Sequence, residues 1–167
     1  VEVCRCVVQI VGEHFLPISY AAMGLTKGPY KVAHSHPQAL GQTRLFLRVT
    51  LAKPERRNAF DAELIAELHE AFRDVGDARV VLLSGDGESF CAGADIEWQR
   101  SAIDLSFDEN VEDAMRLFAM MQAIDRSPAP VVARIQGYAL GGGAGLVAAV
   151  DVAIAANDAV FGFSEVK

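Results

Sequence analysis

The chain has 167 residues, of which 51% are hydrophobic and 22% charged, and its formal net charge is −7. This balance is typical of a folded globular domain and excludes a disordered chain. The acidic charge gives no support for binding nucleic acid or an anionic membrane, and no run approaches the roughly 18 apolar residues of a membrane span. Three cysteines without metal-ligand spacing favour a reducing cytoplasm and no structural metal.

The N-terminal quarter of the chain is weakly patterned. Residues 1–42 show no sustained hydrophobic period, and we predict a poorly patterned N-terminal extension with one candidate strand at residues 7–11. Residues 23–42 are predicted to be an irregular loop. His34 and His36 lie in this loop, and because no carboxylate or cysteine is spaced to join them, we predict no metal site here.

From residue 43 onward, segments with strand and helix patterns alternate. The predicted strands are residues 44–52, 79–85, 131–135, 151–156 and 159–163. The predicted helices are residues 58–72, with Asn58 or Asp61 as N-cap, residues 111–127, and residues 144–150. Strands that alternate with helices need crossover connections, so the pattern predicts an α/β fold with a mostly parallel sheet layered against helices.

Three consecutive glycines, Gly141 to Gly143, separate the strand at 131–135 from a short buried helix. The N-terminus of a helix presents unpaired N–H groups, which can hold a phosphate or the oxygen of an attacked carbonyl. Phosphate-binding patterns fit badly, because no Lys-Ser or Lys-Thr pair follows and Leu146 occupies the last small position of a G-x-G-x-x-G pattern. Close packing of the helix on a strand is the alternative explanation.

A second turn of small residues, "CAGAD" at 91–95, follows the strand at 79–85. If both turns leave the same end of the sheet, they can converge. Together they would then offer two backbone N–H donors to one carbonyl oxygen.

Four linked motifs resemble the crotonase (enoyl-CoA hydratase/isomerase) superfamily in their order and spacing. They are "PERRNAFD" at 54–61, "GESFCAGADI" at 87–96, "IQGYALGGGAGL" at 135–146 and "FGFSEVK" at 161–167. The resemblance covers residues 45–167. It implies the ββα spiral of the ClpP/crotonase fold, incomplete at the C-terminus because family members continue further, and hence a partial crotonase core domain over residues 43–167.

The resemblance also implies a binding site for an acyl-CoA thioester, with CoA as part of the substrate and no other cofactor. The oxyanion hole would be the backbone N–H groups of Ala94 and Gly142. Further contacts with the substrate would come from Ala92, Gly93, Asp95, Ile96 and Gly141. For Arg56 and Arg57 two interpretations remain open. Either they contact the nucleotide phosphates, or they lie in a solvated turn.

The acid/base residues bear on the reaction that the resemblance implies. Two-carboxylate hydratases of the family carry a Glu where this chain has Gly145, whereas the second carboxylate is present as Glu165. We therefore expect a hydratase-type lyase with Glu165 as its one carboxylate acid/base. A more specific similarity is to the bacterial methylglutaconyl-CoA hydratase-like branch. An isomerase moving a double bond from C3 to C2 is the first alternative, and a non-catalytic CoA-binding fragment is the second.

Three polar residues near these motifs are predicted to be structural. Asp95 is expected to cap a turn or helix, Cys91 to be a small core residue, and Asp151 to hydrogen-bond between a helix and a strand. The family resemblance further implies homotrimeric or hexameric assembly of full-length relatives.

Overall fold

The computed structural model of the chain describes the backbone of residues 7–10 and 30–35, and the backbone and side chains of residues 46–163. The strands of the large sheet are β1 (Val7–Ile10), β2 (Tyr30–Ser35), β3 (Phe46–Leu51), β4 (Val81–Gly85), β5 (Val131–Ile135) and β7 (Val152–Ala155). A small second sheet pairs β6 (Tyr138–Leu140) with β8 (Val160–Gly162). The helices are α1 (Ala62–Arg73), α2 (Ile96–Ser101), α3 (Phe107–Asp125) and α4 (Gly142–Ala148), with 3-10 turns η1 (Pro54–Arg56) and η2 (Ala102–Asp104).

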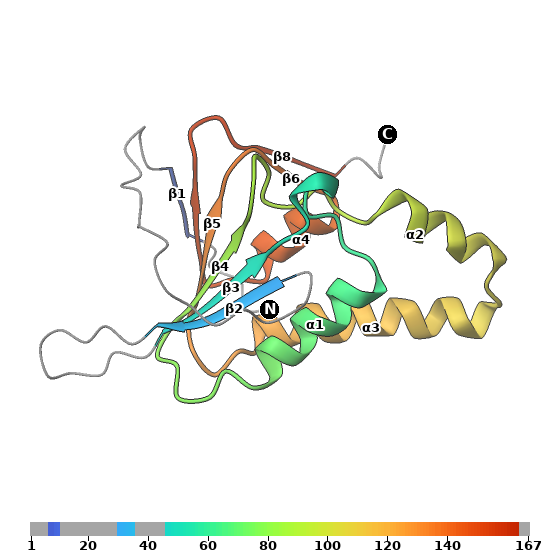
Figure 1. Ribbon diagram of the computed structural model, residues 1–167, viewed down its shortest axis with the longest axis horizontal. Helices are drawn as coiled ribbons and strands as arrows, with labels where there is room; N and C mark the ends of the chain where they lie inside the picture. Colours follow the sequence, from blue (N-terminus) through green and yellow to red (C-terminus); the bar gives the residue numbers. More distant parts are fainter. Residues whose placement is uncertain (1–6, 11–29, 36–45, 164–167) are drawn as a thin grey trace, which may run out of the picture.

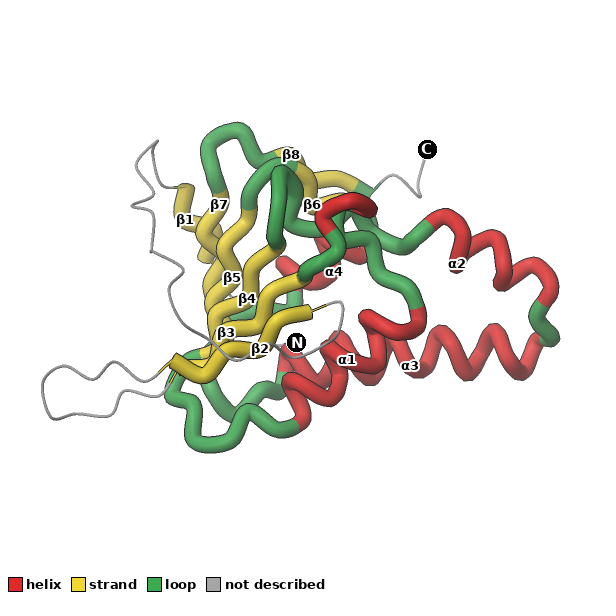
Figure 2. Tube along the Cα trace, in the orientation of Figure 1, coloured by secondary structure: helices red, strands yellow, loops and turns green. Residues whose placement is uncertain are grey.

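The large sheet has the strand order β1-β7-β5-β4-β3-β2. All neighbours run parallel except β2, which pairs antiparallel with β3. Helices α1, α3 and α4 lie on one side of this sheet (Figure 1), and Figure 2 shows the same layering by element type. The predicted α/β fold with a mostly parallel sheet is confirmed.

The core lies between this sheet and its helices. Alternate residues of the central strands face the helices and are buried, namely Leu47, Val49, Leu51, Val81, Leu83, Val131, Ala133, Ile135, Ala153 and Ala155. Helix α1 buries its apolar stripe, Leu64, Ile65, Leu68 and Phe72, against them, as its spacing predicts. The N-cap of α1 is Asp61, whose carboxylate accepts from the Leu64 amide at 3.0 Å.

One segment that we expected to be irregular is a strand. The loop prediction for residues 23–42 is wrong over Tyr30–Ser35, which form β2 and pair along their whole length with β3. His34, expected in that loop, lies in this strand opposite Leu47, whereas His36 lies outside the described residues. A six-residue segment without strong alternation gives little local signal, and its pairing with a buried neighbour decides its structure. Strand β1 confirms the candidate at 7–11.

An arm formed by α2, η2 and the first half of α3 extends away from the sheet (Figure 1). Helix α3 begins at Phe107, four residues before the predicted start. Ser106 explains this difference, because its hydroxyl accepts from the Glu109 amide while the Glu109 carboxylate accepts from the Ser106 amide, which forms a capping box. No helix in the described part of the chain is both long and apolar enough to cross a membrane.

Candidate functional site

The first turn of the site follows β4 and is held by Phe60. The Phe60 amide donates to the Gly93 carbonyl and the Asp95 amide donates to the Phe60 carbonyl, each at 2.9 Å. These two bonds form a parallel bridge between Phe60 and Ala94, so the Ala94 amide lies on the opposite edge of its strand from Phe60. Within residues 46–163 that amide has no hydrogen-bond acceptor.

The second turn follows β5 and β6 and contains the glycine cluster. Two backbone bonds of 3.0 Å join it to the first turn: the Cys91 amide donates to the Tyr138 carbonyl, and the Leu140 amide donates to the Cys91 carbonyl. A Cβ placed on Gly93 would lie 3.6 Å from the Gly142 nitrogen. The two small-residue turns therefore meet, which is the possibility that the sequence raised.

The Gly142 amide is the first of helix α4 and, like that of Ala94, has no acceptor among the described residues. Two unpaired N–H groups on adjoining turns suit a carbonyl oxygen that gains negative charge during a reaction. The arrangement can therefore stabilise an enolate or a tetrahedral oxyanion. Among the described residues, no group of three or more His, Cys, Asp or Glu side chains could hold a metal ion.

The structure gives a packing reason for the consecutive glycines. Gly141 has a φ of +52°, which favours glycine. A Cβ on Gly142 would collide with the ring of Phe60, 2.8 Å from Cε2 and closer still to Cζ, and one on Gly143 would collide with the Cys91 carbonyl oxygen. Close packing, the alternative explanation that the sequence left open, therefore accounts for these glycines.

Two further residues build the site: Phe60, which the sequence did not single out, and Asn58, which it offered only as a possible N-cap of α1. Asn58 is fully buried, and its amide nitrogen donates to the carbonyls of Asp86 and Ser89, while its oxygen accepts from the Lys53 amide. It therefore ties the "PERRN" segment to the loop after β4 rather than capping α1. The signal available in the sequence was the Asn itself, a residue type that tolerates the left-handed conformation found here, φ +54°.

Cys91 and Asp151 have the structural roles that were predicted. Cys91 is buried, and burial raises the pKa of its thiol to about 12, so it is no thiolate nucleophile at neutral pH. The Asp151 carboxylate accepts from the Val131 amide at 2.8 Å and so links the loop after α4 to β5.

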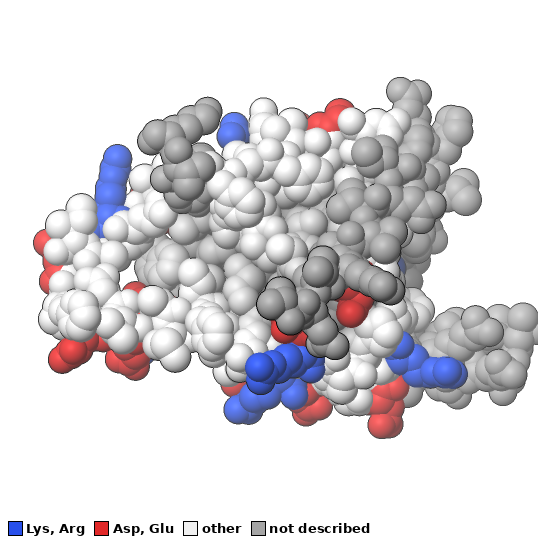
Figure 3. Space-filling model, turned by 180° about the vertical axis from the view of Figure 1, so that it is seen from behind, with Lys and Arg blue, Asp and Glu red and all other residues white. Residues whose placement is uncertain are grey.

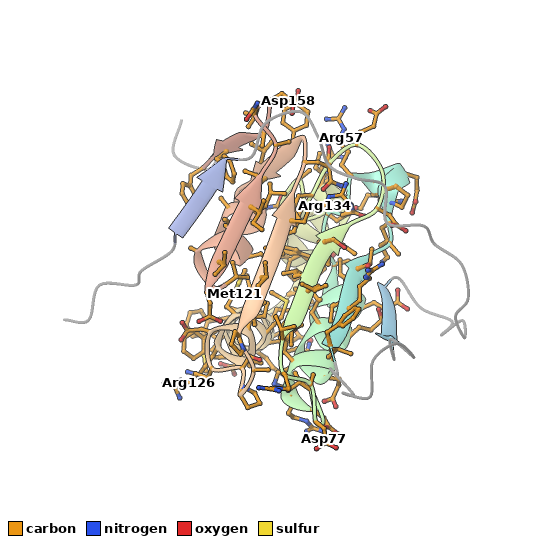
Figure 4. The ribbon with its side chains drawn as sticks, turned by 90° about the vertical axis from the view of Figure 1, so that its left-hand side faces the viewer. Arg57, Asp77, Met121, Arg126, Arg134 and Asp158 are labelled. Carbon is orange, nitrogen blue, oxygen red and sulfur yellow. The ribbon has the colours of Figure 1, made fainter. Side chains whose placement is uncertain are left out.

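The two arginines of the "PERR" segment differ in their partners. Arg56 forms ion pairs with Glu97 at 2.7 Å and Asp95 at 2.9 Å, and the hydrogen bonds that its guanidinium donates to these two carboxylates raise its pKa. Arg57 lies 5.7 Å from the centroid of the Tyr138 ring and has no carboxylate partner within residues 46–163. Figure 4 shows Arg57 at the end of the sheet opposite to Arg126 and Asp77.

A hollow of about 350 Å³ lies beside the first turn. Its lining is mostly charged and consists of Lys53, Glu55, Arg56, Asp61, Asp95, Glu97 and Trp98. Asp95 is the N-cap of α2, as predicted, and Ile96, the first residue of that helix, is 64% exposed. The Ala92 amide donates to the Arg57 carbonyl at 2.9 Å, which places the "AGAD" turn directly against the "PERR" segment.

The small sheet brings the end of the described chain to the glycine cluster. The Gly141 amide donates to the Gly162 carbonyl at 2.7 Å, and β6 and β8 pair in parallel register. Glu165 lies outside the described residues, so its predicted role stays a prediction. Gly145, where the family's other carboxylate would stand, is on α4 one turn after Gly142.

The strand order, the crossover helices and the two joined turns define a crotonase-like α/β core. The family model for enoyl-CoA hydratase/isomerase matches residues 43–167. The chain therefore belongs to the enoyl-CoA hydratase/isomerase family.

Individual relatives agree with this assignment. The chain is 40% identical over 128 residues to "Probable enoyl-CoA hydratase echA6" of Mycobacterium bovis, which covers 75% of this chain and 49% of that protein. It is 35% identical to the protein of the same name from Mycobacterium leprae, covering 72% and 48% of the two chains. An enoyl-CoA hydratase structure from Shewanella pealeana matches 78% of this chain and 48% of its own, with a TM-score of 0.68 and 31% identity. The chain thus spans about half the length of these relatives.

Proposed function

We propose that this chain carries the thioester-binding part of an enoyl-CoA hydratase-type lyase. The observation that supports this function is the meeting of the two turns, which leaves the amides of Ala94 and Gly142 without acceptors among the described residues. A thioester oxygen bound by both amides would be stabilised as it becomes an enolate oxygen. Removing one such donor typically costs about 100-fold to 1,000-fold in rate.

The proposed hydration needs one carboxylate besides these amides. Glu165 takes a proton from water as the water oxygen bonds to C3 of the 2-enoyl thioester, and the C2=C3 electrons move to the thioester oxygen as an enolate. The carboxylic acid then returns the proton to C2, and the carbonyl re-forms. Atoms and charge balance, and Glu165 ends ionised, ready for the next substrate.

The nucleotide of CoA is proposed to lie along the "AGAD" turn, near the charged hollow. Arg57 is the better phosphate ligand of the two arginines, because Arg56 is already neutralised by Asp95 and Glu97. The contact of Arg57 with Tyr138 leaves its N–H groups able to donate. Contacts of Ala92, Gly93, Ile96 and Gly141 with the substrate are part of the same proposal, as are a cytoplasmic location and assembly into a homo-oligomer.

A single carboxylate also suits a Δ3-Δ2 isomerase. There the same group would remove a proton from C2 of a 3-enoyl thioester and return it at C4. Gly145 stands where the family's other carboxylate would be. Its presence there favours neither reaction, because each of them can proceed with a single carboxylate. A non-catalytic CoA-binding fragment would bind the thioester and perform neither reaction.

Three proteins test the proposal: the 167-residue chain, its Glu165→Gln variant, and a chimera that continues the chain with the second half of a relative. Hydration of crotonyl-CoA and methylglutaconyl-CoA is measured for each. We expect Glu165→Gln to lower activity by at least about 100-fold, because it removes the acid/base group. Glu70→Gln, an exposed change on α1, is the matched control and should leave activity unchanged.

The outcomes separate the alternatives. Isomerisation of a 3-enoyl-CoA without hydration would favour the isomerase. Activity in the chimera alone would identify the chain as part of a larger catalytic unit. If the chimera is inactive in both reactions although it is folded, the lyase proposal is wrong.

A further inference from the structure

Phe60 is connected to both turns of the proposed thioester site, to one through its backbone and to the other through its ring. Its amide donates to the Gly93 carbonyl and its carbonyl accepts from the Asp95 amide, each at 2.9 Å. These bonds hold the residues immediately before and after Ala94. The backbone of Phe60 therefore sets where the first of the two proposed donors lies.

The ring of Phe60 reaches the second proposed donor with its far end. A Cβ placed on Gly142 would lie 2.8 Å from Cε2 and 3.4 Å from Cε1, and closest to Cζ, the ring atom most distant from the Phe60 backbone. Because Gly142 has no side chain, the ring packs directly against the main chain whose amide begins α4. Phe60 is 1% exposed, and closely packed interiors yield little to displacement. The ring therefore acts as a spacer between its own backbone and Gly142.

The direct backbone bonds between the two turns end before the donors. The last of them joins the Leu140 amide to the Cys91 carbonyl at 3.0 Å. Ala94 and Gly142 both lie further along their turns, and among the described residues no backbone hydrogen bond joins the turns beyond that point. The separation of the two amides is thus left to packing, and Phe60 is bonded beside one amide and packed against the other.

This separation matters because both amides have to reach one oxygen. An amide hydrogen bond needs a nitrogen-to-oxygen distance of about 2.7–3.2 Å. A misplacement of about 1 Å can cost roughly 100-fold in rate. The loss falls mainly on the transition state, because the oxygen carries its greatest negative charge there. A residue that sets the separation of the donors therefore controls kcat more than substrate affinity.

We propose that Phe60 is the positioning residue of this site: its backbone holds the Ala94 amide, its ring holds the Gly142 amide, and its length sets the separation of the two donors. This inference rests on the proposed function of the two turns. It adds a side chain that acts from the core, through the backbone that it positions, and determines how strongly the thioester carbonyl is polarised.

Two substitutions alter the reach of this side chain without adding a polar atom. Phe60→Leu ends short of Gly142, so the glycine turn can relax toward the core. Phe60→Met is long enough to reach Gly142, but its unbranched chain is flexible and should hold the distance only in part. Phe72→Leu is the matched control, because Phe72 is also 1% exposed and lies at the opposite end of α1 from Phe60.

The first readout is the carbonyl stretching frequency of bound crotonyl-CoA, taken from infrared difference spectra with and without carbon-13 at the carbonyl. The Glu165→Gln background keeps the ester unreacted. The protein is the 167-residue chain, or the chimera described above if the chain alone binds no ester. Two donors should lower the frequency relative to the free ester. We expect Phe60→Leu to abolish about half of this shift or more, because one donor of two is displaced. Phe60→Met should abolish less, and Phe72→Leu should preserve the shift.

The second readout is the rate of hydration, measured with Glu165 intact in whichever protein is active. Phe60→Leu should lower kcat by about 10-fold to 100-fold while KM changes by no more than about twofold. Phe72→Leu should leave both constants within about twofold. It should still lower the urea midpoint to an extent similar to Phe60→Leu, because both changes remove the same atoms from the core.

The results separate this inference from the proposed function. If neither protein binds the ester, or the bound ester has an unshifted carbonyl, both fail. If the shift is present and persists in Phe60→Leu and Phe60→Met, the proposed function stands and the positioning role of Phe60 is wrong. A loss that Phe72→Leu reproduces would also overturn it, because general loosening of the core would then be the cause. If Phe60→Leu does not fold, Phe60→Met decides by the same criterion.

Discussion

Gly142 and Gly145 lie three residues apart in the same helix, yet their surroundings differ. Gly142 faces the ring of Phe60, a fully buried side chain. Gly145 faces the end of Met121 across an open groove. The Phe60 ring thus makes any side chain at Gly142 costly, whereas the flexible methionine can accommodate one at Gly145.

This contrast predicts opposite effects of the same substitution. Gly142→Ala should lower the free energy of unfolding by about 1–3 kcal/mol, because its methyl group overpacks the core against Phe60. Gly145→Ala should be neutral or stabilising by up to about 1 kcal/mol, because alanine is the better helix former and Met121 can move. Urea unfolding followed by circular dichroism measures both. Equal destabilisation by the two changes would contradict the packing explanation.

Helix α2 depends on a single residue at its start. The Asp95 carboxylate accepts from the amides of Glu97 and Trp98 and from the Arg56 guanidinium. Burial acts to raise the pKa of Asp95, but these hydrogen bonds outweigh it and lower the pKa below its ordinary value. One side chain therefore joins α2, the first turn of the site and the "PERR" segment.

Two substitutions separate the cap from the charge. Asp95→Ala removes both and should cost about 1 kcal/mol, the usual effect of losing an N-cap. Asp95→Asn keeps a capping oxygen and should cost less at pH 7, because only the ion pair with Arg56 is lost. Glu97→Gln, at an exposed partner of Arg56, is the matched control and should change stability by no more than about 0.5 kcal/mol.

The pH dependence identifies the contribution of the charge. Because the pKa of Asp95 is lowered on folding, its stabilisation is fully present above the unfolded pKa, about 3.9, and disappears as pH falls through the lower folded value. The stability difference between the unaltered chain and Asp95→Asn should therefore shrink between pH 5 and pH 2. A difference that stays constant over this range would show that the carboxylate charge has no stabilising role.

At the scale of the whole molecule, the most unusual feature is the apolar surface of the arm. Ile103, Phe107, Val111, Met115 and Phe118 are 45–82% exposed. The four on α3 follow a spacing that places them on one face of the helix. Figure 3 shows the arm from behind, with acidic residues along its lower border and an uncharged surface over most of the remainder. Continuous exposed apolar surface of this kind promotes association.

We therefore expect the 167-residue chain to self-associate at micromolar concentration and to bind a hydrophobic dye. Changing Phe107 and Val111 together to serine should reduce both effects, because these two residues are 82% and 45% exposed. Stability should change by no more than about 0.5 kcal/mol per site, as is usual for exposed positions. Sedimentation velocity over a concentration series measures the association. Unchanged association in the double variant would exclude the arm as its cause.

Local patterns were sufficient for the elements that carry their own signal. The amphipathic spacing of α1 and the apolar runs of β4, β5 and β7 are properties of neighbouring residues, and their predictions are confirmed. Family membership likewise follows from four motifs in order along the chain. The Ser106–Glu109 pair in the sequence indicates a capping box and hence the early start of α3. The spacing of apolar residues alone predicted a later start.

Contacts between distant residues were decided only by the tertiary structure. Strand β2 exists because β3 pairs with it, Gly142 must be glycine because Phe60 packs there, and Arg56 is neutralised by Asp95, 39 residues away in the chain. Sequence determines such features only through the whole fold, since each depends on the space that other elements leave. For this protein, the sequence by itself determined the family and the order of the elements. The fold decided which amides, charges and grooves are free to meet a ligand.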